Sequence, residues 1–231
     1  MTEEFRIQPI AHIRNDFSSK FGIPRQSGLL DKMESAVVFE PQFRADEALR
    51  GIEEYSHLWL IWQFSESLRE GFKPTVRPPR LGGNKRVGVF ATRSPFRPNS
   101  LGLSSVRLAG LRKTKDMGTV LIVTGADLMD GTPIFDIKPY IKYSDCHPDA
   151  ECSFSDEFKD YALEVELPKP LLDKFPADKQ ESLILLLKGD PRPSYQHDPE
   201  RIYTLDFAGY SISFAVDDTR LTVTNIEKLS Q

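Results

Sequence analysis

The segment 73–104, KPTVRPPRLGGNKRVGVFATRSPFRPNSLGLS, concentrates side chains that can bind an anion. No Asp or Glu occurs from 71 to 115, whereas these 45 residues contain eleven Lys and Arg. The rest of the chain therefore contains 19 Lys and Arg and all 34 acids. Cations without interleaved acids attract phosphate or another polyanion. Arg93 and Arg97 flank Phe96, an arrangement that would suit a phosphate beside an unstacked base. The alternatives are that acids from elsewhere in the fold pair with the cations, and that Phe96 belongs to the core.

Two short arginine motifs lie outside that segment. PRQSG at 24–28 places a proline with fixed φ beside an arginine fork and an amide, or is simply a solvated turn. DPRPSY at 190–195 would present Arg192 and Tyr195 from a rigid proline frame, or only ends a helix. Neither motif by itself identifies a ligand.

A carboxylate cluster lies in GADLMDGTPIFDIKPY at 125–140. Asp127, Asp130 and Asp136 surround an Asp-Gly turn that follows an apolar run. Together they could bind a hydroxyl pair, an amine or a cation. Turn chemistry alone also explains the Asp-Gly step, with the aspartates facing solvent in a hairpin.

Several catalytic signatures are absent from the sequence. Neither the glycine fingerprint of a Rossmann fold nor a P-loop occurs, no serine stands in a nucleophile elbow, and the four histidines lack metalloprotease spacing. We therefore expect no metal. Cys146 and Cys152 form no zinc motif, and so few cysteines fit a pair of free thiols in a reducing cytosol.

The elements that must position these groups are mostly strands. Apolar residues recur with a period of two in short runs separated by Gly, Pro, Asn or Asp, which predicts a mainly β fold, an antiparallel sandwich or barrel. The runs are 5–13, 36–43, 57–64, 85–92, 104–111 and 119–126. A short helix is predicted between the second and third runs, over 44–56.

The pattern changes near residue 150, and we place a domain boundary within 145–160, dividing the chain into 1–150 and 151–231. Beyond it, DKQESLILLLKGDPRP predicts a helix capped by Asp178 and ended by Gly189, followed by three strands; this is a small C-terminal α+β domain. No apolar run has the length of a membrane helix and the chain start does not read as a signal peptide, so we expect a cytoplasmic protein.

Taken together, the motifs resemble those of the TsaA/TrmO family. KFGIPRQSGLL, LRGIEEYSHLWLIWQF, the basic segment, GADLMDGTPIFDIKPYI and DPRPSY match in order. The resemblance implies S-adenosylmethionine-dependent methylation of N6 of N6-threonylcarbamoyladenosine, at position 37 of threonine tRNAs. It also implies a small antiparallel β-barrel in place of a Rossmann fold, and a homodimer with sites near the subunit interface.

The family motifs carry site residues onto this chain. The implied cofactor contacts are Pro24, Arg25, Gln26, Ser65, Glu66, Arg93, Leu103, Asp130, Gly131, Thr132 and Pro133. At position 65 many relatives have a histidine or another polar residue. We expect the anticodon arm of tRNA to lie on Arg77, Arg80, Lys85, Arg86 and Arg97, and the base that accepts the N6 proton is one of Asp127, Asp136, His57 and Tyr195.

Two other functions remain open at this stage. The chain could be a non-catalytic module that binds S-adenosylmethionine or RNA, or a methyltransferase that acts on another nucleoside. Methyl incorporation into tRNA separates the first from an enzyme, and the identity of the methylated nucleoside separates the second.

Overall fold

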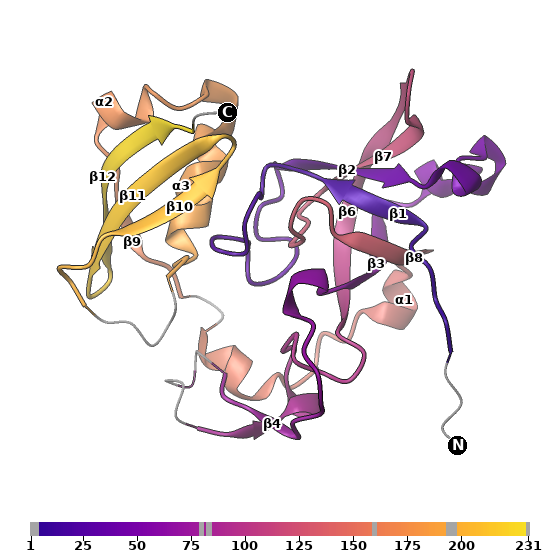
Figure 1. Cartoon of the computed structure of the whole chain (residues 1–231), viewed down its shortest axis with the longest axis horizontal. Helices are drawn as coiled ribbons and strands as arrows, with labels where there is room; N and C mark the ends of the chain where they lie inside the picture. Colours follow the sequence, from indigo (N-terminus) through magenta and orange to yellow (C-terminus); the bar gives the residue numbers. More distant parts are fainter. Residues whose placement is uncertain (1–4, 79–80, 82–84, 159–160, 193–197, 230–231) are drawn as a thin grey trace.

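The computed structural model describes residues 5–78, 81, 85–158, 161–192 and 198–229. Its first part is a closed ring of six antiparallel strands in the order β1-β2-β7-β6-β3-β8 (Figure 1). The strands are β1 (Ala11–Arg14), β2 (Glu34–Phe39), β3 (His57–Gln63), β6 (Leu101–Thr114), β7 (Gly118–Thr124) and β8 (Pro133–Pro139). The predicted predominance of strands is confirmed.

The ring forms because its strands alternate apolar and polar side chains. In β3, Leu58, Leu60 and Trp62 point into the ring and are buried, whereas Trp59 and Ile61 lie half-buried on its outer face. Successive side chains of a strand point to opposite faces, so one run supplies the core and the other the surface. Closure also leaves the ring without an exposed edge strand.

A second sheet follows the ring in the sequence, with the order β10-β11-β12-β9. Its elements are β9 (Glu164–Glu166), α2 (Lys169–Leu172), α3 (Gln180–Lys188), β10 (Tyr203–Phe207), β11 (Tyr210–Asp217) and β12 (Arg220–Lys228); the short helix α1 (Lys142–Asp145) precedes them. The apolar face of α3 packs into the core of this sheet. Among the described residues no helix is long and apolar enough to cross a membrane.

The connection between β1 and β2 (15–33) belongs to the second core and not to the ring. Phe17, Leu30 and Met33 are buried in that core, and the Phe17 ring stacks on Phe207 with centroids 5.6 Å apart. Gly22 takes a positive φ of 90°, and a Cβ there would lie 1.9 Å from a methyl carbon of a leucine in β10. This loop therefore fastens the two sheets together.

Two local predictions are wrong. The segment 44–56 forms two 3-10 turns, Asp46–Leu49 and Ile52–Glu54, separated by Gly51 at a φ of 83°, because a left-handed residue interrupts helical hydrogen bonding. Asp178 does not cap α3: the chain enters through a 3-10 turn at Ala177–Lys179, so Lys179 occupies the cap position.

The predicted strand over 85–92 is much shorter in the structure. It contributes only β5 (Val87–Gly88), which pairs with β4 (Thr75–Val76) in a small separate hairpin. Figure 1 shows β4 on a lobe that extends away from the ring. Prolines and glycines on both sides of the pair limit its length.

Candidate functional site

Three long connections leave the same end of the ring. They join β1 to β2 (15–33), β3 to β6 (64–100) and β7 to β8 (125–132). Antiparallel pairing places the end of one strand beside the start of its neighbour, as the pairing of Gln63 with Leu101 shows. The connections therefore meet at one edge of the ring, which we call the three-loop end.

Every residue predicted to contact the cofactor lies at or next to the three-loop end. Nine of them lie on the three connections and the other two in the first residues of β6 and β8: Pro24, Arg25, Gln26, Ser65, Glu66, Arg93, Asp130, Gly131 and Thr132, then Leu103 and Pro133. Strand order brings them to one edge although three separate parts of the sequence carry them. This arrangement, and not any single motif, makes the three-loop end the candidate site.

The first and third connections touch through their backbones. The N–H of Gly28 donates to the carbonyl of Gly125 over 2.8 Å. Gly125 has a φ of 78°, and a Cβ there would stand 3.1 Å from the Gly28 Cα. A side chain here would be strained by the positive φ and would press on Gly28, so Gly125 favours the close approach of PRQSG to the acidic motif.

The first and second connections meet through side chains. An Arg93 guanidinium N–H donates to the Gln26 side-chain oxygen. Both residues are predicted cofactor contacts. The structure therefore joins two predicted cofactor contacts that are 67 positions apart in the sequence.

Asp127 is a half-buried carboxylate of the three-loop end, and Ser104 holds it in place. The Ser104 hydroxyl donates to Asp127 over 2.5 Å, and the Trp62 indole N–H donates to the Ser104 oxygen over 2.9 Å. Burial raises the pKa of Asp127, although the Ser104 hydroxyl, the nearby Arg93 charge and the backbone N–H of Ser27 act in the opposite direction. Asp127 is thus a carboxylate poised to hold a proton more readily than an exposed one.

Asp130 and Gly131 form the predicted turn. Gly131 has a φ of 77°, and its N–H donates to the carbonyl of Ile13 over 2.9 Å. The Asp130 carboxylate accepts the backbone N–H of Asn15 at 3.0 Å and lies 3.5 Å from the Arg14 guanidinium. Side-chain exposure of 37% leaves Asp130 open to a hydroxyl or an amine of a ligand.

The other candidate bases lie elsewhere. His57 starts β3, six residues from the three-loop end or ~20 Å along the strand, and its ring accepts or donates to Ser56. Asp136 stands on β8 with its carboxylate 3.0 Å from Lys138. Tyr195 lies outside the described residues. Among the candidates that the structure describes, Asp127 alone reaches the three-loop end.

Arg25 turns toward the C-terminal domain. Its guanidinium donates to the carbonyls of Asp190 and Arg192 at 2.8 and 3.1 Å. Those two residues form a buried ion pair at 3.0 Å, and the Tyr161 hydroxyl donates to Asp190 at 2.9 Å. DPRPSY therefore does more than end a helix: the carbonyls of its first residues accept hydrogen bonds from Arg25 of the PRQSG loop.

The cations predicted to contact RNA divide into two kinds. Arg77, Lys85 and Arg86 are exposed, and within the described ranges no ion pair involves them. Arg97 is half-buried and donates to the carbonyl of Thr92 at 3.0 Å, so it shapes its own loop. Arg80 lies outside the described residues.

Within the described part of the acid-free stretch 71–115, the ion pairs with acids from elsewhere lie near its C-terminal end. Arg112 meets Glu34 at 3.2 Å, and Lys113 meets Asp46 at 3.4 Å. Both pairs lie in the second half of β6, away from the 64–100 connection. The alternative of local neutralisation therefore applies to β6 and not to the exposed loop cations.

Phe96 matches neither sequence-based alternative fully. It is 38% exposed, and the Arg69 guanidinium lies over its ring, 3.8 Å from the centroid. One face of the ring is thus occupied by a cation of the same loop. At the start of the same connection, Ser65 and Glu66 lie in a 3-10 turn. The ammonium of Lys20 contacts the Glu66 carbonyl there.

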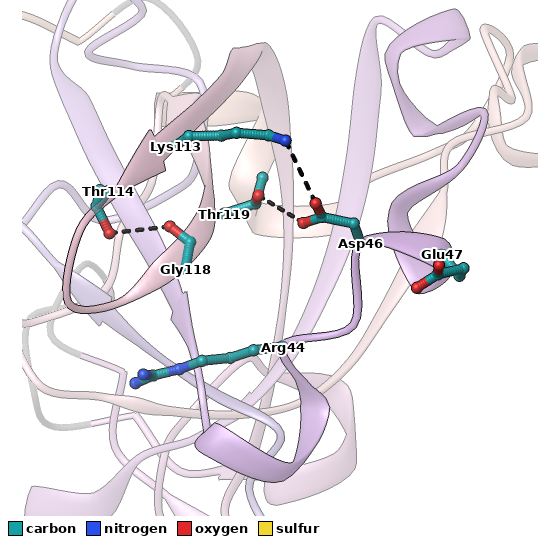
Figure 2. A pocket seen from close by; sticks show the side chains of 7 residues that line it. All are labelled: Arg44, Asp46, Glu47, Lys113, Thr114, Gly118 and Thr119. Atoms are coloured by element: carbon teal, nitrogen blue, oxygen red, sulfur yellow. Dashed lines mark hydrogen bonds and ion pairs between the residues drawn. The ribbon is translucent and has the colours of Figure 1, made fainter.

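Figure 2 shows a surface depression at the opposite end of the ring. Lys113 and the Thr119 hydroxyl both bind the Asp46 carboxylate there, and these contacts hold the pKa of Asp46 below its usual range. Asp46 and Lys113 therefore neutralise each other, and no predicted site residue lines the depression. Elsewhere among the described residues, no group of three or more His, Cys, Asp or Glu gathers as a metal site would require.

Residues missed by the sequence analysis include Ser104 and Trp62, which hold Asp127 in place. The available signal was alternation in SLGLSSV, which puts Ser104 on the inner face of β6. A serine that is 1% exposed must find a partner for its hydroxyl. Its partner is 23 residues distant in the sequence, so alternation alone did not identify it.

Comparisons with known proteins place this chain in one family. Residues 12–146 match the family model of the tRNA-methyltransferase O N-terminal domain, and residues 151–229 match that of the TrmO C-terminal domain. A tRNA (adenine(37)-N6)-methyltransferase of Escherichia coli is 37% identical over 96% of this chain and 98% of its own length. One from Eikenella corrodens is 40% identical over 71% of this chain and 92% of its own length. A crystal structure of TrmO from Pseudomonas aeruginosa superposes with a TM-score of 0.78 at 30% identity, covering 99% of both chains.

Proposed function

Because this chain belongs to the tRNA-methyltransferase O family, we propose that it is an S-adenosylmethionine-dependent tRNA methyltransferase that acts on N6 of N6-threonylcarbamoyladenosine at position 37 of threonine tRNAs. The observation that supports this proposal is the convergence of three loops on one edge of the ring. Those loops hold the motifs of the resemblance, and Arg93 joins two of them through Gln26. Names of relatives that refer to S-adenosylmethionine support the cofactor.

The donor set of the three-loop end fits S-adenosylmethionine. When bound, the cofactor supplies a methyl group on a positively charged sulfur. Asp130 offers a half-exposed carboxylate for hydroxyl or amino groups, and the adjacent Gly131 allows close backbone approach. Asp127 adds a second negative charge, and Arg93 and Gln26 offer donors and an acceptor for a carboxylate or an adenine edge. We propose these four side-chain groups, with the other motif residues, as the cofactor site.

Methyl transfer needs alignment more than covalent help. Holding the accepting nitrogen in line with the methyl carbon can lower the barrier by ~7–11 kcal/mol. Here Gly28, Gly125 and the Arg93–Gln26 contact hold the loops against one another, and Arg25 ties the first loop to the C-terminal domain. Such a scaffold would restrict both reactants to one geometry.

N6 of the substrate carries a proton that must leave as the new carbon–nitrogen bond forms. We propose Asp127 as its acceptor, because burial has moved its pKa upward toward the working pH of a general base. The Ser104 hydroxyl holds Oδ1 of this carboxylate in place. Lys85, Arg86 and Arg77 would meanwhile hold the phosphates of the anticodon arm.

Three further parts of the proposal concern organisation. We propose that 1–150 is the cofactor-binding domain, with the ring as its small non-Rossmann barrel, and that 151–231 is a separate α+β domain. A homodimer is proposed because Leu103, 57% exposed, lines a depression on the outer face of the ring together with Trp59 and Ile61. Polar and charged side chains form the rest of its lining: Lys138, Ser144, Asp145 and His147. We place the enzyme in the cytoplasm, where tRNA is its substrate.

Methyl transfer can be tested with labelled cofactor and two RNA substrates. The proposal predicts incorporation into threonine tRNA that carries N6-threonylcarbamoyladenosine and none into the same tRNA with plain adenosine at position 37. Mass spectrometry of digested tRNA then identifies the product nucleoside. Cofactor binding without incorporation into any tRNA would favour the non-catalytic module, and incorporation into the unmodified control would favour another nucleoside.

A further inference from the structure

Two phenylalanines stand side by side on the surface of the 64–100 connection. Phe72 and Phe90 are 57% and 70% exposed, with ring centroids 6.2 Å apart and planes inclined by 24°. Phenylalanine is usually buried, and scattered exposure needs no explanation. Two adjacent exposed rings form a flat apolar shelf, which marks an interaction site more than an accident of surface composition.

The backbone beneath the shelf is held in place. Phe72 precedes β4, whose Thr75 and Val76 pair with Gly88 and Val87 of β5. Phe90 lies two residues after the end of β5. The N–H of Val89 donates to the carbonyl of Pro74 at 3.0 Å, and the Val89 side chain is 1% exposed. A buried anchor under two exposed rings presents them as a preformed surface.

The charge around the shelf selects the kind of partner. No acid occurs from 71 to 115, and Lys73, Arg77, Lys85 and Arg86 near the rings are exposed. An apolar protein partner would not account for four exposed cations that form no ion pair with another described residue. A single-stranded nucleic acid does, because it combines flat apolar bases with a phosphate for each of them.

The position of the shelf relates it to the candidate site. Phe90 stands three residues before Arg93, so the two Cα atoms are at most ~11 Å apart. Arg93 in turn binds Gln26 at the three-loop end. A base resting on the shelf would therefore be close in the RNA chain to a base held at the site.

We propose that Phe72 and Phe90 form a stacking shelf for an unpaired anticodon-loop base that neighbours the methylated nucleoside. This inference rests on the proposed function and specifies how the RNA is held. Single-stranded loops are recognised by stacking splayed bases on aromatic rings. Loss of one stacked base should weaken RNA binding roughly 5- to 150-fold.

The test compares wild type with two double variants. Phe72→Leu with Phe90→Leu keeps an apolar surface but removes both π faces, and Phe72→Tyr with Phe90→Tyr restores them. Phe5→Ala serves as a control: it removes an 81% exposed phenylalanine near the start of the chain, distant in sequence from the 64–100 connection. Each protein is titrated with an anticodon stem-loop that carries 2-aminopurine beside position 37, and cofactor affinity is measured by calorimetry to verify folding.

The proposal expects the Leu pair to lose at least fivefold in RNA affinity and most of the 2-aminopurine quenching. The Tyr pair and the Phe5 variant should bind like wild type, with unchanged cofactor affinity throughout. RNA binding by the Leu pair at wild-type strength would overturn the shelf alone. So would a change of oligomeric state in the Leu pair by sedimentation, which would assign the rings to a second copy of the chain. Wild type that neither binds nor methylates tRNA would instead overturn the shelf and the proposed function together.

Discussion

Ser104→Ala tests whether the hydrogen-bonded chain from Trp62 to Asp127 organises the site. The substitution removes a buried hydroxyl that accepts from the Trp62 indole and donates to Asp127. A buried N–H left without an acceptor costs about 1–3 kcal/mol, and a hydrogen bond to a charged group contributes about 1.5–3 kcal/mol. Since one hydroxyl makes both contacts, we expect a loss of about 3 kcal/mol in the free energy of unfolding, or ~6–12 °C in melting temperature.

The loss should depend on pH because Ser104 stabilises the ionised form of Asp127. Without that hydrogen bond, the native-state pKa of Asp127 rises further above its unfolded-state value. A carboxyl group with a raised native pKa binds more protons in the native state, so stability falls as pH rises between the unfolded and native values. The destabilisation by Ser104→Ala should therefore be smallest near pH 4 and reach its full size above the native pKa.

The assay is urea unfolding of wild type and variant at several pH values. Ser105→Ala is the matched control, because it removes the same hydroxyl from the next residue of β6, which is half-buried and faces the other way. The control should change stability by less than ~0.5 kcal/mol. If the two variants unfold alike, or if the Ser104→Ala loss is constant with pH, the hydrogen-bonded chain does not stabilise Asp127 as we infer.

Three further variants, two single and one double, probe the site. Asp127→Asn should lower kcat at least ~100-fold and abolish the acidic limb of the pH–rate profile, and an unchanged profile would remove Asp127 as the base. Because burial raises the pKa of Asp127, the unfolding free energy of the variant relative to wild type should also increase as pH rises. Gly22→Ala should lower the free energy of unfolding by ~2–4 kcal/mol in urea and weaken cofactor binding in calorimetry, because φ is 90° and a Cβ would lie 1.9 Å from a leucine methyl carbon of the second core. A variant as stable as wild type would show that the loop relaxes freely. Lys85→Ala with Arg86→Ala should raise the KM for tRNA and lower the magnitude of the slope of log K for tRNA binding against log salt by ~1.4–1.8. Arg112→Ala is the control: it removes a cation that is paired with Glu34 and should leave the slope unchanged.

Strand patterns were readable from the sequence where burial is one-sided. The run 57–64 became β3 almost residue for residue, because its alternation matches the pleat. Prediction failed where local preference competes with chain geometry. The helical pattern over 44–56 gave way to 3-10 turns around Gly51, and the apolar run 85–92 kept only two paired residues.

The sequence by itself determined the chemistry available: a stretch without acids, an arginine motif at 24–28 and an Asp-Gly turn at 130–131, in an order typical of one family. Residue types and local turns depend on neighbouring residues in the chain, so they can be read one segment at a time. Tertiary structure alone decided which of these groups meet. Closure of the ring brought three loops to one edge, turned His57 away and left Asp127 half-buried beside Ser104, because strand pairing and desolvation arise from contacts between residues far apart in the sequence.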